Sequence, residues 1–126
     1  MNVPAELLYT KEHEWIRMEG QTAVIGITDH AQDKMGDIVF VELPVSGAHI
    51  DAASPLANLE SVKAVSEVFM PQSGTVEAVN TALEAAPESL NTDPYGSWIA
   101  QVAFDEPLLP GSYLDAAAYA AFCAED

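Results

Sequence analysis

A succession of short strand-like segments, separated by turn residues, is the feature that most constrains what this chain can fold into. Val, Ile, Phe and Thr concentrate in these segments, and turn residues such as Gly, Pro and Ser stand between most of them. Short strands at such close spacing favour a compact sandwich or barrel. The predicted strands are Glu14–Met18, Gln21–Thr28, Asp37–Leu43, two strands within Pro55–Met70, Thr75–Val79 and Trp98–Phe104.

Two helices are predicted among the strands. Residues Asp29–Met35 should form a short helix after the second predicted strand, because Thr28 can cap its N-terminus and Gly36 can end it. Residues Ser112–Glu125 are rich in alanine and predict a C-terminal helix that its first residue or Asp115 caps. The chain is therefore expected to be mostly β, with two main helices.

Local signals refine this prediction. Gly26 stands in the middle of a predicted strand, which indicates either a close approach of another group to the backbone or a β-bulge. Residues Thr81–Ser97 are turn-rich and predict one helical turn. No Gly, Pro or Asn marks a turn around Lys63, so the pattern alone places no hairpin tip at Lys63. With 126 residues and no linker, the chain is expected to form one domain over residues 1–126.

The charge balance excludes two classes of partner. Four Lys and Arg residues against twenty Asp and Glu residues give a formal net charge of −16. Nucleic acid and anionic membrane lipid are both bound through clusters of basic side chains, and the sequence has none. The acidity leaves two alternatives open, which are electrostatic steering toward partners with basic patches and an ordinary acidic surface.

Cysteine usage and hydropathy also restrict the interpretation. Cys123 is the only cysteine, so no intrachain disulfide can form, and it is interpreted as a small hydrophobic residue rather than a catalytic thiol. No apolar run reaches the roughly 18 residues of a membrane span. The N-terminal residues show neither the basic region of a signal peptide nor an Arg-rich transit sequence. These features predict a cytoplasmic, bacterial protein, with a processed mitochondrial form as the alternative.

The sequence shows no catalytic or metal-binding motif. It contains neither a glycine-rich phosphate loop nor the G-x-S-x-G motif of a nucleophile elbow. His13, His30 and His49 are scattered without ligand spacing, so each is interpreted as a surface or packing residue and no metal site is predicted. Carboxylates are so abundant that pairs of them carry no information about acid–base catalysis. An enzyme with a carboxylate-rich cleft is thus the least supported alternative.

Lys63 is the side chain whose setting suggests chemistry. It is one of four basic residues in the chain, and it lies in a mostly apolar, strand-like stretch with Glu60 and Glu67 on either side. Val62 and Ala64 are uncharged, so a modifying enzyme or a partner could approach Lys63 without a competing cation. The residues alone leave two interpretations, a solvated lysine or a site of covalent attachment.

The residues around Lys63 also carry a family resemblance. Glu60-Ser61-Val62-Lys63-Ala64 follows Gly-Asp-Ile-Val-Phe-Val-Glu-Leu-Pro, which spans Gly36–Pro44. On these segments the chain resembles the H protein of the glycine cleavage system. The matching segments run nearly from end to end and are Tyr9–Trp15, Val24–Gln32, Gly36–Pro44, Glu60–Ala64, Pro71–Val76 and Asn91–Tyr95.

The resemblance implies a carrier rather than an enzyme. It implies a mostly β, lipoyl-domain-like flattened sandwich or barrel of short antiparallel strands, with a short helix after the second strand and a C-terminal helix. Lys63 would bear lipoate in amide linkage at a hairpin tip, within an attachment motif formed by Glu60, Ser61, Val62 and Ala64. Amide formation would remove the positive charge of Lys63.

The same resemblance implies the partners. Glycine decarboxylase would load an aminomethyl group onto the lipoyl arm as CO2 is released, and aminomethyltransferase would pass the one-carbon unit to tetrahydrofolate. Dihydrolipoyl dehydrogenase would reoxidise the arm, and lipoate-attaching enzymes would modify Lys63. A carrier that visits several enzymes is expected to be a monomer. Two alternatives stay open, an H-like protein that relays lipoate to other lipoyl enzymes and an acidic interaction module with an unmodified lysine.

An aminomethyl-loaded arm would need shelter from hydrolysis. Carboxylates near the arm could hold its protonated amine by charge-assisted hydrogen bonds. The candidates are Glu14, in the His-Glu-Trp part of a matching segment, and Glu67, four residues after Lys63. Lys34, just before the predicted end of the first helix, is a weaker candidate for the same cleft.

Overall fold

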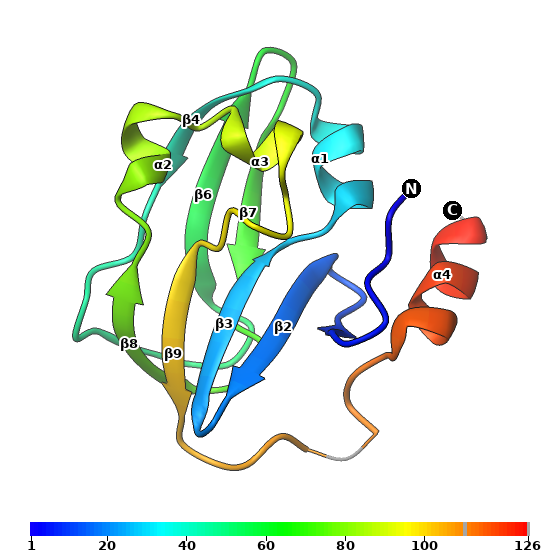
Figure 1. The fold of residues 1–126 in the computed structure, drawn as a ribbon. Helices are drawn as coiled ribbons and strands as arrows, with labels where there is room; N and C mark the ends of the chain where they lie inside the picture. Colours follow the sequence, from blue (N-terminus) through cyan, green and yellow to red (C-terminus); the bar gives the residue numbers. More distant parts are fainter. Residues whose placement is uncertain (110, 126) are drawn as a thin grey trace.

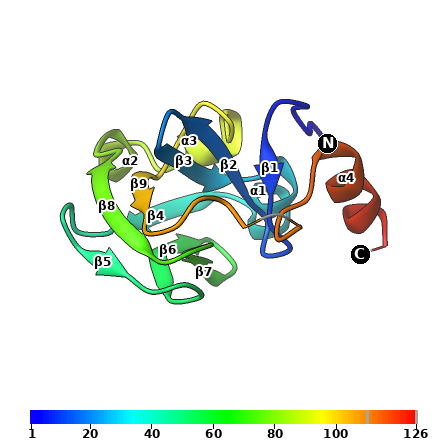
Figure 2. The ribbon, with the colours of Figure 1, turned by 90° about the horizontal axis from the view of Figure 1, so that it is seen from below.

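Two antiparallel sheets form the body of the protein in the computed structural model, which describes residues 1–109 and 111–125. One sheet has six strands in the order β1-β2-β3-β9-β8-β5, and the other has three in the order β4-β6-β7. The two sheets lie as layers over each other (Figures 1 and 2), which confirms the predicted sandwich. The strands are β1 Leu8–Tyr9, β2 Glu14–Glu19, β3 Thr22–Ile27, β4 Ile38–Glu42, β5 His49–Ile50, β6 Pro55–Ser61, β7 Val65–Phe69, β8 Gly74–Val79 and β9 Ala100–Phe104. The helices are α1 Asp29–Met35, α2 Ala82–Ala85, α3 Ser89–Thr92 and α4 Ala116–Ala124.

In the β2–β3 hairpin, the absence of a side chain at Gly26 makes room for the ring of Trp15. The chain reverses at Gly20, which has a φ of 66°. Strand register places Trp15 opposite Gly26, and a Cβ atom at position 26 would lie 2.6 Å from three atoms of the Trp15 ring. The close approach predicted at Gly26 is therefore confirmed. Because the indole is fully buried, its Nε1 needs a partner, and it donates to the Pro94 carbonyl at 3.0 Å.

Helix α1 begins and ends where its capping residues predict. Thr28 Oγ1 accepts a hydrogen bond from the Ala31 N–H at 3.2 Å, which caps the N-terminus. Gly36 ends the helix, and its N–H donates to the Gln32 carbonyl at 3.0 Å. Its φ of 74° and ψ of −161° lie in a region that is open almost only to glycine. Gly36 therefore directs the chain from α1 into β4.

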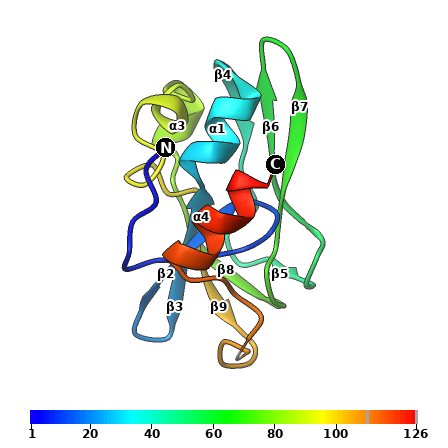
Figure 3. The same cartoon turned by 90° about the vertical axis from the view of Figure 1, so that its right-hand side faces the viewer.

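Two hydrophobic clusters stabilise these layers. The larger cluster fills the space between the sheets, with Ile25 and Leu59 among its buried members. The smaller cluster joins β1 to α4, where the rings of Tyr9 and Tyr119 stack with centroids 4.6 Å apart. Burial of each such large side chain contributes roughly 1.5–3 kcal/mol. Helix α4 is thereby held against the outside of the sandwich, below α1 in Figure 3.

The fold differs from the prediction in its short elements. Helix α4 begins at Ala116 rather than Ser112, because Asp115 supplies the cap while Leu114 is still extended and pairs with β1. Residues Thr81–Ser97 contain two short helices instead of one helical turn. Strands β1 and β5 have two residues each, too few to show an alternating pattern. No helix in the described ranges is long and apolar enough to cross a membrane.

Candidate functional site

The β6–β7 hairpin carries Lys63 at its tip, which projects at one end of the molecule (Figures 1 and 3). Ser61 builds the turn, since its N–H donates to the Ala64 carbonyl at 2.8 Å. The hydroxyl oxygen of Ser61 also accepts from the N–H groups of Lys63 and Ala64, at 3.3 and 3.0 Å. A serine hydroxyl that bonds to nearby backbone groups is a turn-forming device. It does here what the missing Gly, Pro or Asn would otherwise do.

The corner between α1 and β4 supports the tip from the side. The Val62 N–H donates to the Asp37 carbonyl at 3.0 Å. The Lys63 side chain lies beside Gly36, where an added Cβ atom would be 3.1 Å from Lys63 Cε. The Asn91 side chain holds this corner, because it donates to the Gly36 carbonyl at 2.8 Å and accepts from the first N–H of β4 at 2.8 Å. Lys63 therefore extends from a hydrogen-bonded mount.

Apolar side chains are exposed around the tip. Val62 and Val65 are 70% and 73% exposed, and Phe40 on strand β4 is 51% exposed. Strand register aligns Phe40, Glu60 and Val65 across the three-stranded sheet. Lys63 is itself exposed, so its amine is open to a modifying enzyme. The apolar residues next to it offer such an enzyme a surface to contact.

One cavity of about 180 Å³ is lined by all three predicted shelter residues. Glu14 is only 2% exposed, whereas Glu67 on β7 and Lys34 on α1 are exposed. Met35 lines the same cavity and directly precedes Gly36, the residue beside the Lys63 side chain. The cavity and the mount of Lys63 thus share the end of α1.

A second cavity, of about 380 Å³, also includes Glu14 in its lining. Its other walls include the turn after β7, with Gln72, the segment before α4, with Tyr113, and the turn before β6, with Ala52. Although this cavity is larger, it is not the one that shares residues with the end of α1 beside Lys63. Residues at the end of α1 line the smaller cavity and none lines the larger one, so the smaller cavity shares an element with the mount of Lys63.

Glu14 has an unusual environment for a carboxylate. Burial raises the pKa of Glu14 to about 7, although two hydrogen bonds act in the opposite direction. Thr10 Oγ1 donates to Glu14 Oε1 at 2.8 Å, and the Phe69 N–H donates to Oε2 at 3.1 Å. The charge of Glu12 adds a smaller upward effect on this pKa. Near neutral pH the Glu14 carboxyl is therefore balanced between its two forms, and a neighbouring cation would favour the ionised one.

Comparison with known proteins places the chain in a family. The family described as Glycine cleavage H-protein matches residues 7–126. The chain belongs to the glycine cleavage H-protein family. The resemblance carried by the residues around Lys63 is thereby confirmed.

Relatives of this H-protein family match over nearly their whole length. The glycine cleavage system H protein of Symbiobacterium thermophilum is 51% identical over 125 residues, which covers 98% of each chain. That of Acidobacterium capsulatum is 48% identical over 126 residues, covering 100% of this chain and 98% of the relative. The crystal structure of a glycine cleavage system H protein from Mycobacterium marinum is 36% identical, with a TM-score of 0.84 over 94% of this chain and 97% of that one.

Two residues that support the site were missed by sequence reasoning. Asn91 holds the corner beside Lys63, and Thr10 holds the Glu14 carboxyl. Both lie in segments that resemble the H-protein family, which is the only signal that could have singled them out. The role of Asn91 depends on bonds to residues 53 and 55 positions away in the sequence. The role of Thr10 depends on the burial of Glu14. A local pattern reveals neither.

Proposed function

We propose that this protein is the lipoylated carrier of the glycine cleavage system, with lipoate in amide linkage to Nζ of Lys63. The observation that carries the proposal is the position of Lys63, exposed at a hairpin tip within Glu60–Ala64, in a chain of the H-protein family. A group attached there starts from strands whose direction is fixed by the sheet. The attached group can therefore extend away from the protein surface while the core stays unchanged.

The residues at the tip fit lipoate. The attachment needs a reachable primary amine, and Lys63 supplies it, with Val62 and Ala64 leaving its approach free of competing charge. When bound, lipoate supplies a disulfide that accepts an aminomethyl group and is returned as a dithiol. The chain itself catalyses no step in this proposal. Its contribution is a rigid base that keeps the attached group at high effective concentration near each enzyme it visits.

The carrier role implies four kinds of partner. Glycine decarboxylase, aminomethyltransferase and dihydrolipoyl dehydrogenase would act on the attached group in turn, and a lipoate-attaching enzyme would acylate Lys63. Acylation removes one positive charge, so the modified protein is one unit more negative than −16. Such a charge steers encounters toward enzymes with basic surfaces around their entrances. A monomeric carrier leaves the tip open to each of them.

Glu14 and Glu67 are the residues we assign to sheltering the cargo in the 180 Å³ cavity. A protonated amine that enters the cavity would favour the ionised form of Glu14 and pair with it where little water is present. Glu67 lies at the exposed side of the same cavity. Lys34 has the wrong charge to pair with an ammonium group, so its role is to cover the cavity with its aliphatic stem.

Attachment is tested by intact-mass measurement and peptide mapping of protein from cells supplied with lipoate. We expect the mass of one lipoyl group on the peptide that contains Lys63. Lys63→Arg should abolish it, and Lys34→Arg, a matched control on α1, should not. Unmodified Lys63 in the wild-type protein would overturn the carrier proposal.

Sheltering is tested by loading the lipoylated protein with glycine decarboxylase and following hydrolysis of the loaded form. Glu14→Gln and Glu67→Gln should each speed hydrolysis, whereas Glu84→Gln, exposed on α2 and outside the cavity, should not. Equal hydrolysis rates in all four proteins would remove the sheltering role and leave attachment untouched.

A deletion experiment separates glycine cleavage from lipoate relay. Deleting the protein should stop release of CO2 from glycine, and loss of lipoylation on 2-oxoacid dehydrogenases alone would favour lipoate relay.

A further inference from the structure

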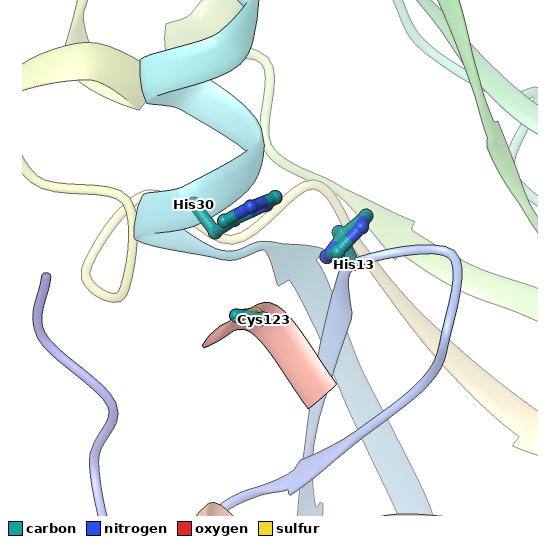
Figure 4. Close-up of side chains that lie close together, drawn as sticks. All are labelled: His13, His30 and Cys123. Atoms are coloured by element: carbon teal, nitrogen blue, oxygen red, sulfur yellow. The ribbon is translucent and has the colours of Figure 1, made fainter. Parts of the chain in front are cut away.

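Two histidines and the only cysteine meet in space although they lie far apart in the sequence. His13 comes from the turn before β2, His30 from the first turn of α1 and Cys123 from the last turn of α4. Figure 4 shows the three side chains gathered at one point between these elements. One nitrogen of each ring and the Cys123 sulfur all lie within 4.8 Å of one another. Their scattered positions predicted surface or packing roles, and the tertiary fold gives them a common neighbourhood instead.

The fold holds His13 in this place. Its backbone has a φ of 68°, a left-handed conformation that is uncommon outside glycine. Backbone hydrogen bonds fix it on both sides, with the His13 N–H donating to the Thr10 carbonyl and the Thr28 N–H donating to the His13 carbonyl, both at 3.1 Å. The ring of His13 stacks on that of His30 with centroids 4.4 Å apart.

A hydrogen-bonded chain orients the His13 ring. Its Nδ1 lies 2.7 Å from the Tyr119 hydroxyl, which in turn lies 2.7 Å from Thr28 Oγ1. This contact fixes the direction of the ring, and with the proton on Nδ1 donated to the Tyr119 hydroxyl, Nε2 keeps its lone pair for a metal ion. Histidines that ligate a metal commonly donate their other ring N–H to an oxygen acceptor, a part that the Tyr119 hydroxyl can take here.

We propose that His13, His30 and Cys123 bind one Zn²⁺ ion. Two imidazoles and a thiolate form a donor set that suits this borderline-soft cation, and three protein ligands leave a fourth position for water. With Zn–N of about 2.0 Å and Zn–S of about 2.3 Å, tetrahedral ligand atoms stand about 3.5 Å apart. To reach this spacing from the observed limit of 4.8 Å, the ligand atoms must approach by about 1 Å, and the stacked rings must turn so that their nitrogens face the ion. Binding replaces the thiol proton of Cys123, which leaves to solvent.

The setting of the cluster favours a cation. The formal charge of −16 attracts cations to the whole surface. Cys123 is 8% exposed and both histidines are half-buried, so competing water is restricted. His13 and His30 also line the 180 Å³ cavity, which gives an ion a path of entry. The site needs no group on Lys63, so it can be tested independently of the carrier role.

The test uses metal-free, unlipoylated protein titrated with Co²⁺ as a spectroscopic substitute for Zn²⁺, and with Zn²⁺ in calorimetry. We expect one equivalent of each metal and a thiolate-to-Co²⁺ charge-transfer band. Cys123→Ser should abolish the band, and Cys123→Ser and His30→Gln should each weaken Zn²⁺ binding at least about tenfold. His49→Gln is the matched control, because His49 lies elsewhere and bonds to Asp105 at 2.7 Å.

A measurement on the wild-type protein avoids dependence on the folding of the variants. Nuclear magnetic resonance of the imidazole nitrogens should show that Zn²⁺ shifts the signals of His13 and His30 and leaves those of His49 in place. The proposal is overturned by the absence of a charge-transfer band at one equivalent of Co²⁺. It is equally overturned if Cys123→Ser binds Zn²⁺ as tightly as wild type, or if Zn²⁺ shifts only the His49 signals.

Discussion

Replacement of Glu14 by glutamine should change how the stability of the protein depends on pH. Glu14 is 2% exposed, and burial raises its pKa from 4.5 to about 7. A carboxyl whose pKa is higher in the folded state favours folding while it is protonated. Its contribution is complete below about pH 4.5 and is lost as the pH rises through about 7. The amide of Glu14→Gln can accept from the Phe69 N–H and donate to the Thr10 hydroxyl, so it keeps both contacts without ionising.

The size of the effect follows from the two pKa values. The step from 4.5 to about 7, at about 1.36 kcal/mol per pKa unit, corresponds to about 3 kcal/mol. Between about pH 4 and about pH 8, wild type should therefore lose about 3 kcal/mol of unfolding free energy that Glu14→Gln retains. Ionisation of the remaining acidic side chains affects both proteins. The difference between them isolates the buried carboxyl.

Urea denaturation at about pH 4, 6 and 8, followed by tryptophan fluorescence, measures this difference. Trp15 is fully buried and should report the loss of the native core. Glu67→Gln is the control, because Glu67 is exposed and its replacement should leave the pH profile parallel to that of wild type. If the gap between wild type and Glu14→Gln stays constant over this pH range, burial does not govern the Glu14 carboxyl and the reasoning is refuted.

Three further substitutions test the mount of Lys63. Gly36→Ala should lower the free energy of unfolding by about 1–3 kcal/mol, because alanine is strained at φ 74° and ψ −161°, and an unchanged urea midpoint would contradict this. Asn91→Ala removes the bonds that hold the α1–β4 corner, so it should lower the free energy of unfolding by about 1–3 kcal/mol and slow lipoylation of Lys63. Wild-type values of both quantities would show that other contacts hold the corner. Ser61→Ala should cost at most about 1 kcal/mol because the turn is exposed, yet slow lipoylation of Lys63 in a time course by mass spectrometry, and an unchanged rate would show that the turn keeps its form without the hydroxyl.

Local chemistry made parts of this fold predictable. Thr28 and Gly36 delimit α1 through bonds to residues three and four positions away, so the sequence contains both partners within one window. Gly26 indicated a close approach, although not that Trp15 fills the space. The motif Glu60–Ala64 singled out Lys63 by its resemblance to the H-protein family.

The hairpin tip at Lys63 is the feature that the local sequence pattern did not predict. Ser61 forms the turn without a Gly, Pro or Asn, and the corner at Asp37 and Asn91 supports the tip from outside the hairpin. A period-two pattern predicts neither effect. The Ser61 hydroxyl forms the turn through local bonds that alternation does not encode, and the bonds of Asp37 and Asn91 exist only once the layers have formed. The hairpin is therefore a product of tertiary contacts as much as of its own residues.

By itself, the sequence determined the class of fold and the acidic charge, and it singled out Lys63 as the lysine that we propose for attachment. Only the tertiary structure decided the environment of that lysine, since burial and proximity are properties of packing. Burial makes Glu14 a carboxyl that titrates near neutral pH, and packing of α1 and α4 around the turn before β2 brings His13, His30 and Cys123 together. Residue types fix what each side chain can do, and the fold determines which side chains lie close enough to share a ligand.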